Sequence, residues 1–140
     1  MHRYIKGARS ERELMAMLEE LGYSIMRSAG SGVNSVSPDI IAFKKGKGYA
    51  FECKAWEKSS ISIPIEKYEL LRKWEDNTAM ETYMAWRMNG RGWFFIRLHE
   101  MNRATANYTV TMKDAERISR RFDVFNGGAD ATGNYGVSNG

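Results

Sequence analysis

Two apolar segments on either side of a short basic turn constrain the fold of this chain more than any other feature. The segments cover residues 40–43 and 49–56, and a polar, glycine-containing stretch, residues 44–48, separates them. Apolar runs of this length, bounded by turn residues, predict buried strands. Because the connection is so short, we expect the two strands to form an antiparallel hairpin.

Three charged side chains accompany these apolar segments: Asp39, Glu52 and Lys54. A turn at residues 46–47 predicts that Asp39 lies opposite Lys54. The same register places Glu52 opposite Ile41, so that all three charged groups share one face of the hairpin. A structural ion pair is one interpretation of this cluster. Charges within apolar strands are costly unless they are paired or bound to a cation, however, and this cost favours a functional site.

The two carboxylates predict a site for a divalent cation. Mg²⁺ commonly binds through one or two carboxylates together with water and a substrate phosphate, and Asp39 and Glu52 can supply such ligands. We expect Mn²⁺ to serve as a substitute. A cation held here would activate a water molecule and neutralise charge on a phosphodiester. Lys54 could orient that water or balance charge on the phosphate, so the pattern favours metal-dependent phosphodiester hydrolysis.

An amphipathic helix is predicted over about residues 7–21, because its leucines follow a helical spacing and Gly22 can end it. Glu11 heads the inward stripe of this helix. It could be a site residue, or simply an acid that the helix dipole favours in the first turn. After a short predicted strand at residues 23–26, Arg27 begins a serine- and glycine-rich loop that leads to the hairpin. This loop could hold a phosphate or act only as a flexible connector.

The rest of the chain predicts two further helices and three further strands. They are a helix from Pro64 to about Asn77, strands over residues 82–88 and 92–98 joined by a hairpin turn, a strand over residues 107–110, and a helix that begins at Thr111. The first of these helices is expected to bury Leu70, Leu71 and Trp74. The second carries an apolar stripe and an opposite basic face, made of Ala115, Ile118, Phe122 and Phe125 and of Lys113, Arg117, Arg120 and Arg121.

Together these elements predict one α/β domain over residues 1–125, with a mixed central β-sheet flanked by helices. Residues 126–140 are rich in glycine and poor in apolar side chains, so we expect a flexible C-terminal tail there.

Composition narrows the class of protein. The chain has 140 residues, a formal net charge of +4 and one cysteine. Its length suits a single domain, and its basic charge favours a polyanionic partner. One cysteine excludes an intrachain disulfide. We find no apolar stretch long enough to span a membrane and no signal-peptide pattern, so we expect a soluble, cytoplasmic, nucleoid-associated protein without a membrane partner.

Longer motifs extend the pattern around Asp39 and Glu52. The segments 6–14 (KGARSEREL), 21–23 (LGY), 27–31 (RSAGS) and 38–42 (PDIIA) follow one another in the same order and spacing as in the archaeal Holliday junction resolvases of the Hjc type. The chain resembles that family clearly from about residue 4 to residue 56. The family belongs to the PD-(D/E)xK nucleases, so the resemblance implies a restriction-endonuclease-like fold.

The resemblance implies a metal-dependent endonuclease that acts as a homodimer and makes paired symmetric nicks in four-way DNA junctions, during recombination and repair. Its implied catalytic residues are Glu11, Ser31, Asp39, Glu52 and Lys54, with Glu11, Asp39 and Glu52 as metal ligands. Arg12 and Arg27 fall on basic positions of the family. Further DNA contacts are predicted for basic residues near the site in the sequence, although each alone could be an ordinary surface charge: Arg3, Lys6, Arg9, Lys44, Lys45 and Lys47.

Two alternatives stay open from the residues. The first is another nuclease of the same superfamily, either restriction-like or a repair nicking enzyme, because catalytic residues do not define the shape of the substrate. The second is a DNA-binding dimer that keeps the fold without the chemistry. Retention of all the charged site residues argues against this second alternative. The sequence does not identify a recombination or replication protein as a partner.

Overall fold

The computed structural model describes residues 2–28 and 37–126, and of residues 2–6 it describes the backbone alone. The predicted C-terminal tail therefore lies almost entirely outside the described residues. The described elements, in chain order, are α1 (His2–Glu20), β1 (Ser24–Arg27), β2 (Ile40–Lys44), β3 (Lys47–Ala55), β4 (Ser60–Pro64), α2 (Ile65–Thr78), β5 (Glu81–Met88), β6 (Gly92–Arg97), η1 (Leu98–Glu100), β7 (Asn102–Arg103), β8 (Asn107–Thr111), α3 (Met112–Ile118) and η2 (Phe122–Phe125).

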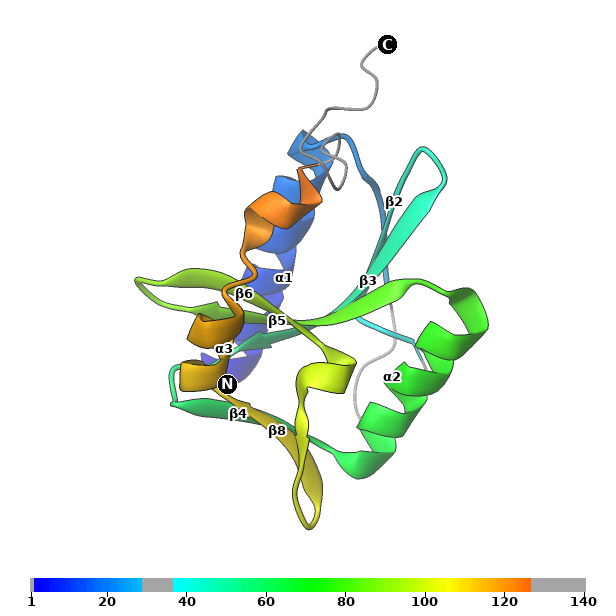
Figure 1. Cartoon of the computed structure of the whole chain (residues 1–140). Coiled ribbons are helices and arrows are strands. Elements are labelled where there is room, and N and C mark those ends of the chain that lie inside the picture. Colours follow the sequence, from blue (N-terminus) through cyan, green and yellow to red (C-terminus); the bar gives the residue numbers. More distant parts are fainter. Residues whose placement is uncertain (1, 29–36, 127–140) are drawn as a thin grey trace.

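A five-stranded sheet forms the centre of the domain, in the order β1-β2-β3-β5-β6. Strands β3 and β5 run parallel and the other neighbours are antiparallel, so the predicted mixed sheet is confirmed. In Figure 1, α1 stands behind this sheet and α2 lies to its right. No described helix is long and apolar enough to cross a membrane.

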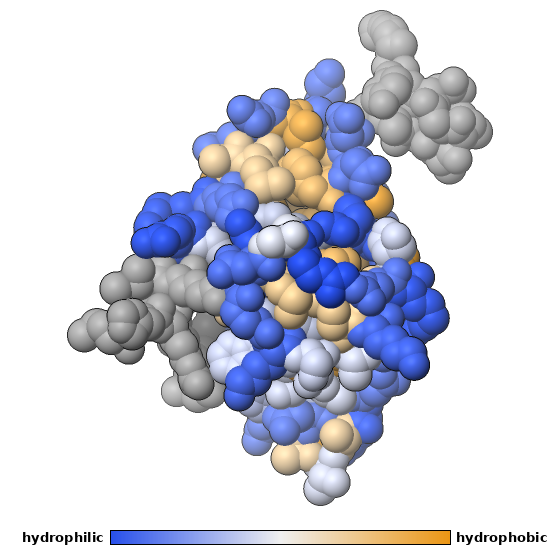
Figure 2. Space-filling view, turned by 90° about the vertical axis from the view of Figure 1, so that its left-hand side faces the viewer, coloured by the Kyte–Doolittle hydropathy of each residue, from blue (hydrophilic) through white to orange (hydrophobic). Residues whose placement is uncertain are grey.

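Each face of the sheet has its own core, because successive strand residues point to opposite faces. The core on the α1 side includes Leu14, Leu18, Phe51, Phe95 and Phe125. The core on the α2 side includes Leu71, Met84, Trp86 and Ile96. On the face of the molecule in Figure 2, hydrophilic side chains predominate and apolar ones gather mainly toward its upper end. The two helices thus cover the apolar faces of a central sheet, as the sequence predicts.

The hairpin of β2 and β3 forms as predicted, but its predicted turn is wrong by one residue. Lys44 pairs with Lys47, so the two turn residues are Lys45 and Gly46. Both have a positive φ, 49° and 84° respectively. Two-residue turns with positive φ at both positions match the right-handed twist of the paired strands, and this match explains the tighter connection.

The new register changes the partners of the charged residues but not the face that they share. Ile41 pairs with Ala50 instead of Glu52, and the same register places Asp39 opposite Glu52 instead of Lys54. Moving a hairpin turn by one residue moves each partner by two positions, and the side-chain period is also two. The predicted convergence on one face therefore survives the error in the turn.

A second, smaller sheet was not predicted. It has the order β4-β8-β7 and joins segments far apart in the chain, with Ile61 paired to Val110. In Figure 1, β4 and β8 lie below the central sheet. Pro64 directly precedes α2, so β4 delivers the chain into the helix that faces the candidate site.

The predicted C-terminal helix is wrong in its length. Helix α3 ends at Ile118, because Ser119 adopts the left-handed conformation with φ 58°. The predicted basic face is therefore divided, and Arg120 lies outside the helix, where it pairs with Glu100 at 2.7 Å. Phe125 belongs to the short helix η2 and is buried against the α1 core.

Candidate active site

The charged residues of the hairpin meet where β2 begins and β3 approaches its end. The Oδ2 atom of Asp39 accepts a hydrogen bond from the backbone N–H of Cys53 at 2.9 Å. The backbone carbonyl of Asp39 accepts a second one, also 2.9 Å long, from the N–H of Ser28. These bonds attach Asp39 to the strands on both sides of it. Burial raises the pKa of this carboxyl, and the Cys53 bond and nearby cations such as Lys67 oppose the shift.

Glu52 is the most strongly perturbed acid of the site. Its Oε2 atom lies 3.7 Å from the Nζ atom of Lys67. Its Oε1 atom is buried and has no hydrogen-bond partner among the described residues. Burial, followed by the negative charge of Asp39, raises the pKa of Glu52 from 4.5 to about 8, although Lys67 and Lys54 lower it. Two half-buried carboxylates beside each other, one with a buried and unsatisfied oxygen, form a donor set that suits a hard divalent cation.

Glu11 approaches Asp39 from α1, whereas Glu52 lies on the α2 side of the sheet. Each of these two glutamates interacts electrostatically with Asp39. The pKa of Glu11 is raised by burial and by Asp39, and its Oε1 atom accepts a hydrogen bond of 3.1 Å from Arg27. Among the side chains that the structure describes, no three from carboxylates, histidines or cysteines are grouped closely enough to hold a metal ion together. Asp39 therefore links two acids that flank it.

Lys67 is the site residue that sequence reasoning missed. It lies on α2 and its side chain is buried, with a residue exposure of 8%. The prediction that Leu71 faces inward is confirmed, while Leu70 and Trp74 are only half-buried. Because Lys67 precedes Leu71 by four residues, it lies on the same stripe of the helix. A lysine on an inward stripe was the signal that could have identified it.

We expect Lys67→Met to lower the free energy of unfolding by about 1–1.5 kcal/mol in EDTA at about pH 9. Without its nearest cation the pKa of Glu52 rises above about 8, and the folded protein takes up a proton at this pH. In a Glu52→Gln background the same change should cost less than about 0.5 kcal/mol, as a double-mutant cycle by urea denaturation can measure. Lys73→Met is the matched control, since Lys73 is exposed on the same helix. An equal cost in both backgrounds would contradict the coupling to Glu52.

The lysines of the hairpin turn do not lie beside the acids. Lys44 donates to a backbone carbonyl after α1 at 2.6 Å, and Lys47 lies 3.8 Å from a carboxylate of β5. Lys45 is exposed in the turn. At about 3.3 Å per strand residue, this turn is about 20 Å from Glu52. A role of these lysines in DNA binding stays a prediction, now for a surface distant from the acids.

The structure describes the side chains of three of the other predicted site residues and not those of the remaining three. Arg27 is brought to the acids, and Arg9 and Arg12 are exposed on α1. Ser31 and the side chains of Arg3 and Lys6 lie outside what the structure describes. The roles predicted for these six residues are therefore not decided by the fold.

The chain matches known proteins along most of its length. The model of a family described as archaeal Holliday junction resolvase (Hjc) matches residues 2–125. A crossover junction endodeoxyribonuclease Hjc from Methanocaldococcus jannaschii is 36% identical over 110 residues, which cover 78% of each chain. A relative of the same name from Archaeoglobus fulgidus is 28% identical over 106 residues, or 75% of this chain and 78% of the relative.

Solved structures support the fold. The structure of Archaeoglobus fulgidus Hjc, a Holliday junction resolvase, matches with a TM-score of 0.77 and 22% identity, covering 86% of this chain and 95% of the other. A bacterial homing endonuclease, I-Ssp6803I, matches with a TM-score of 0.50 and 7% identity, over 77% of this chain and 74% of the other. These likenesses confirm the predicted restriction-endonuclease-like α/β fold.

Proposed function

The chain belongs to the archaeal Holliday junction resolvase (Hjc) family, and we propose on this basis that it is a crossover junction endodeoxyribonuclease. It would make paired symmetric nicks in four-way DNA junctions. The observation that carries the proposal is the half-buried pair of Asp39 and Glu52, in which one buried carboxylate oxygen has no described partner. Such a pair is costly for stability alone, and it is suited to a cation at a phosphodiester.

The roles of the site residues follow from their positions. Asp39 and Glu52 would hold Mg²⁺, with Mn²⁺ as a substitute, and Glu11 would complete or orient the ligand set from the α1 side. A bound divalent cation lowers the pKa of a water molecule and neutralises charge on the phosphate. Lys54 shares the face of Glu52 and would stabilise developing negative charge.

Arg27 donates a hydrogen bond to Glu11 and interacts electrostatically with Asp39. Its guanidinium can form paired hydrogen bonds with phosphate oxygens, so we assign it to the scissile phosphate or a neighbouring one. Ser31 would act on the same phosphate. A homodimer would bring two such sites to equivalent strands of a two-fold symmetric junction, which accounts for paired cuts.

Cleavage of a synthetic four-way junction and of a linear duplex of equal length, each with Mg²⁺, tests the function. We expect symmetric nicks in the junction and none in the duplex. Equal cutting of both would favour a restriction-like or nicking nuclease instead. Tight binding without any cutting would favour a DNA-binding protein without catalysis and overturn the proposal.

A further inference from the structure

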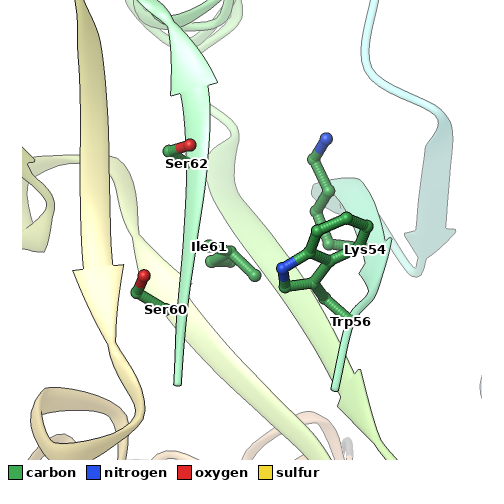
Figure 3. Close-up of a pocket in the computed structure, with 5 residues that line it drawn as sticks. All are labelled: Lys54, Trp56, Ser60, Ile61 and Ser62. Carbon is green, nitrogen blue, oxygen red and sulfur yellow. The ribbon is translucent and has the colours of Figure 1, made fainter. Parts of the chain in front are cut away.

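An open pocket lies directly beside the candidate active site, between the end of β3 and strand β4. It has a volume of about 240 Å³ and is lined by Lys54, Trp56, Ser60, Ile61 and Ser62. Figure 3 shows Ile61 pointing from β4 toward the ring of Trp56, with Lys54 above that ring in the view. Lys54 also interacts electrostatically with Asp39 and Glu52. Lys54 therefore belongs both to the pocket lining and to the charged groups around the acids.

Trp56 is held in place by its backbone. Its N–H donates to the carbonyl of Arg87 at 3.2 Å, and its own carbonyl accepts a hydrogen bond of 2.9 Å from the indole N–H of Trp86. Its half-buried ring packs against the α2-side core. Because its backbone is bonded to the central sheet and its ring packs against the core, the indole is positioned before any ligand arrives. A fixed aromatic ring loses little conformational entropy on binding.

Positive charge surrounds this ring. The Nζ atom of Lys58 lies 5.7 Å from the centre of the Trp56 ring, and Lys54 lines the other part of the pocket. Lys58 lies over the face of the ring, so a base that stacks there displaces this flexible side chain toward the phosphate. An aromatic ring with ammonium groups near it matches the chemistry of a nucleotide, which has a planar base and flanking phosphates. The pocket lining itself contains no carboxylate.

We propose that this pocket binds one unstacked nucleotide of the cleaved strand, next to the scissile phosphate, with its base against Trp56 and its phosphate near Lys58 or Lys54. The proposal rests on the proposed junction cleavage and adds the part of the substrate that the site recognises. Trp56 is a binding residue in it, whereas the acids and Lys54 carry the chemistry.

The size of the pocket indicates why the nucleotide must be unstacked. A volume of about 240 Å³ is below the roughly 300–1,000 Å³ of pockets for drug-sized ligands, and it suits a single base better than a base pair. A base in continuous duplex has both faces covered by its neighbours and must be extruded at a cost. Bases at a branch point are less fully stacked, so extruding one of them costs less free energy. The pocket would therefore favour branched DNA over linear duplex.

Two variants separate stacking from packing. Trp56→Leu keeps an apolar contact with Ile61 but has no aromatic face, and Trp56→Phe keeps both. With Ca²⁺ in place of Mg²⁺ to suppress cleavage, we expect Trp56→Leu to bind a synthetic four-way junction about tenfold or more weakly, and linear duplex almost unchanged. Trp56→Phe should restore most of the junction affinity. Equal thermal midpoints of the three proteins would establish that folding is unaffected.

A fluorescent base provides a second readout that does not depend on cleavage. At saturating protein, we expect the fluorescence of 2-aminopurine next to the cut position to be quenched in the complexes with the unchanged protein and with Trp56→Phe, relative to the complex with Trp56→Leu. Equal losses of junction and duplex affinity, or quenching that persists in Trp56→Leu, would overturn the pocket assignment. If the unchanged protein cuts junctions and Trp56→Leu behaves identically, the pocket assignment alone fails. Absence of junction cutting by the unchanged protein would instead reject the proposed function.

Discussion

Asp39→Asn is expected to lower the rate of junction cleavage by about 10³-fold or more, while junction binding stays close to that of the unchanged protein. The amide has the shape of the carboxylate, and its oxygen can still accept the hydrogen bond that Cys53 donates to Asp39. The lost charge is the one that would hold the cation and that interacts with both Glu11 and Glu52. Single-turnover cleavage with Mg²⁺ and equilibrium binding in Ca²⁺ measure the two effects separately.

Asp76→Asn is the matched control for this substitution. Asp76 is exposed on α2, and its change to asparagine removes the same charge from the protein. We expect it to cleave normally. Full activity of Asp39→Asn would reject the site assignment. A parallel loss of binding and cleavage would instead show that Asp39 supports the fold or the DNA surface and not the chemistry.

Glu52→Gln is expected to affect activity and stability in opposite directions. Cleavage should fall by about 10³-fold or more, because the second proposed metal ligand is lost. The metal-free protein should become more stable, since a buried charge is replaced by a neutral group of the same shape. An enzyme that gains stability when a site acid is neutralised maintains that acid for its function.

The pH dependence follows from the direction of the shift. Burial and Asp39 raise the pKa of Glu52 from 4.5 to about 8, so the folded protein keeps a proton on this group that the unfolded chain loses. Stability of the metal-free protein therefore falls as pH increases from about 4.5 to about 8. Glu52→Gln should remove this slope and add stability on the order of 5 kcal/mol above about pH 8. Thermal or urea unfolding in EDTA across this range measures it.

Glu69→Gln controls for the general effect of removing a carboxylate, because Glu69 is exposed on α2. It should leave the pH dependence of unfolding unchanged. A Glu52→Gln protein that is less stable than the unchanged protein at pH 8 would contradict the inference that the charge of Glu52 lowers the free energy of unfolding.

Much of the fold could be predicted because its signals are local. Apolar runs bounded by turn residues identified β2 and β3, and Asn89-Gly90-Arg91 marked the turn between β5 and β6. The second sheet was missed because its pairing, Ile61 with Val110, joins segments that are distant in sequence. Such pairings depend on the whole topology, and single-segment periodicity contains no information about them.

The final helix shows the same limit. Apolar residues recur at helical spacing from Ala115 to Phe125, so the sequence predicts a single helix that includes both residues. The chain instead leaves the helix at Ser119 and uses Phe125 to fill the α1-side core. An apolar side chain can be buried in a core from a helix or from an irregular segment, and tertiary packing decides which of the two forms.

The sequence by itself determined which charged groups meet within the hairpin. Asp39, Glu52 and Lys54 share a face in the predicted and in the observed register, because side chains alternate with a period of two and a shifted turn moves partners by two. Tertiary structure alone decided that Lys67 of α2 lies against Glu52, and that Trp56 and Ile61 form a pocket beside Lys54. These contacts join separate elements, and only the packing of helix on sheet and of one sheet beside another brings them within reach.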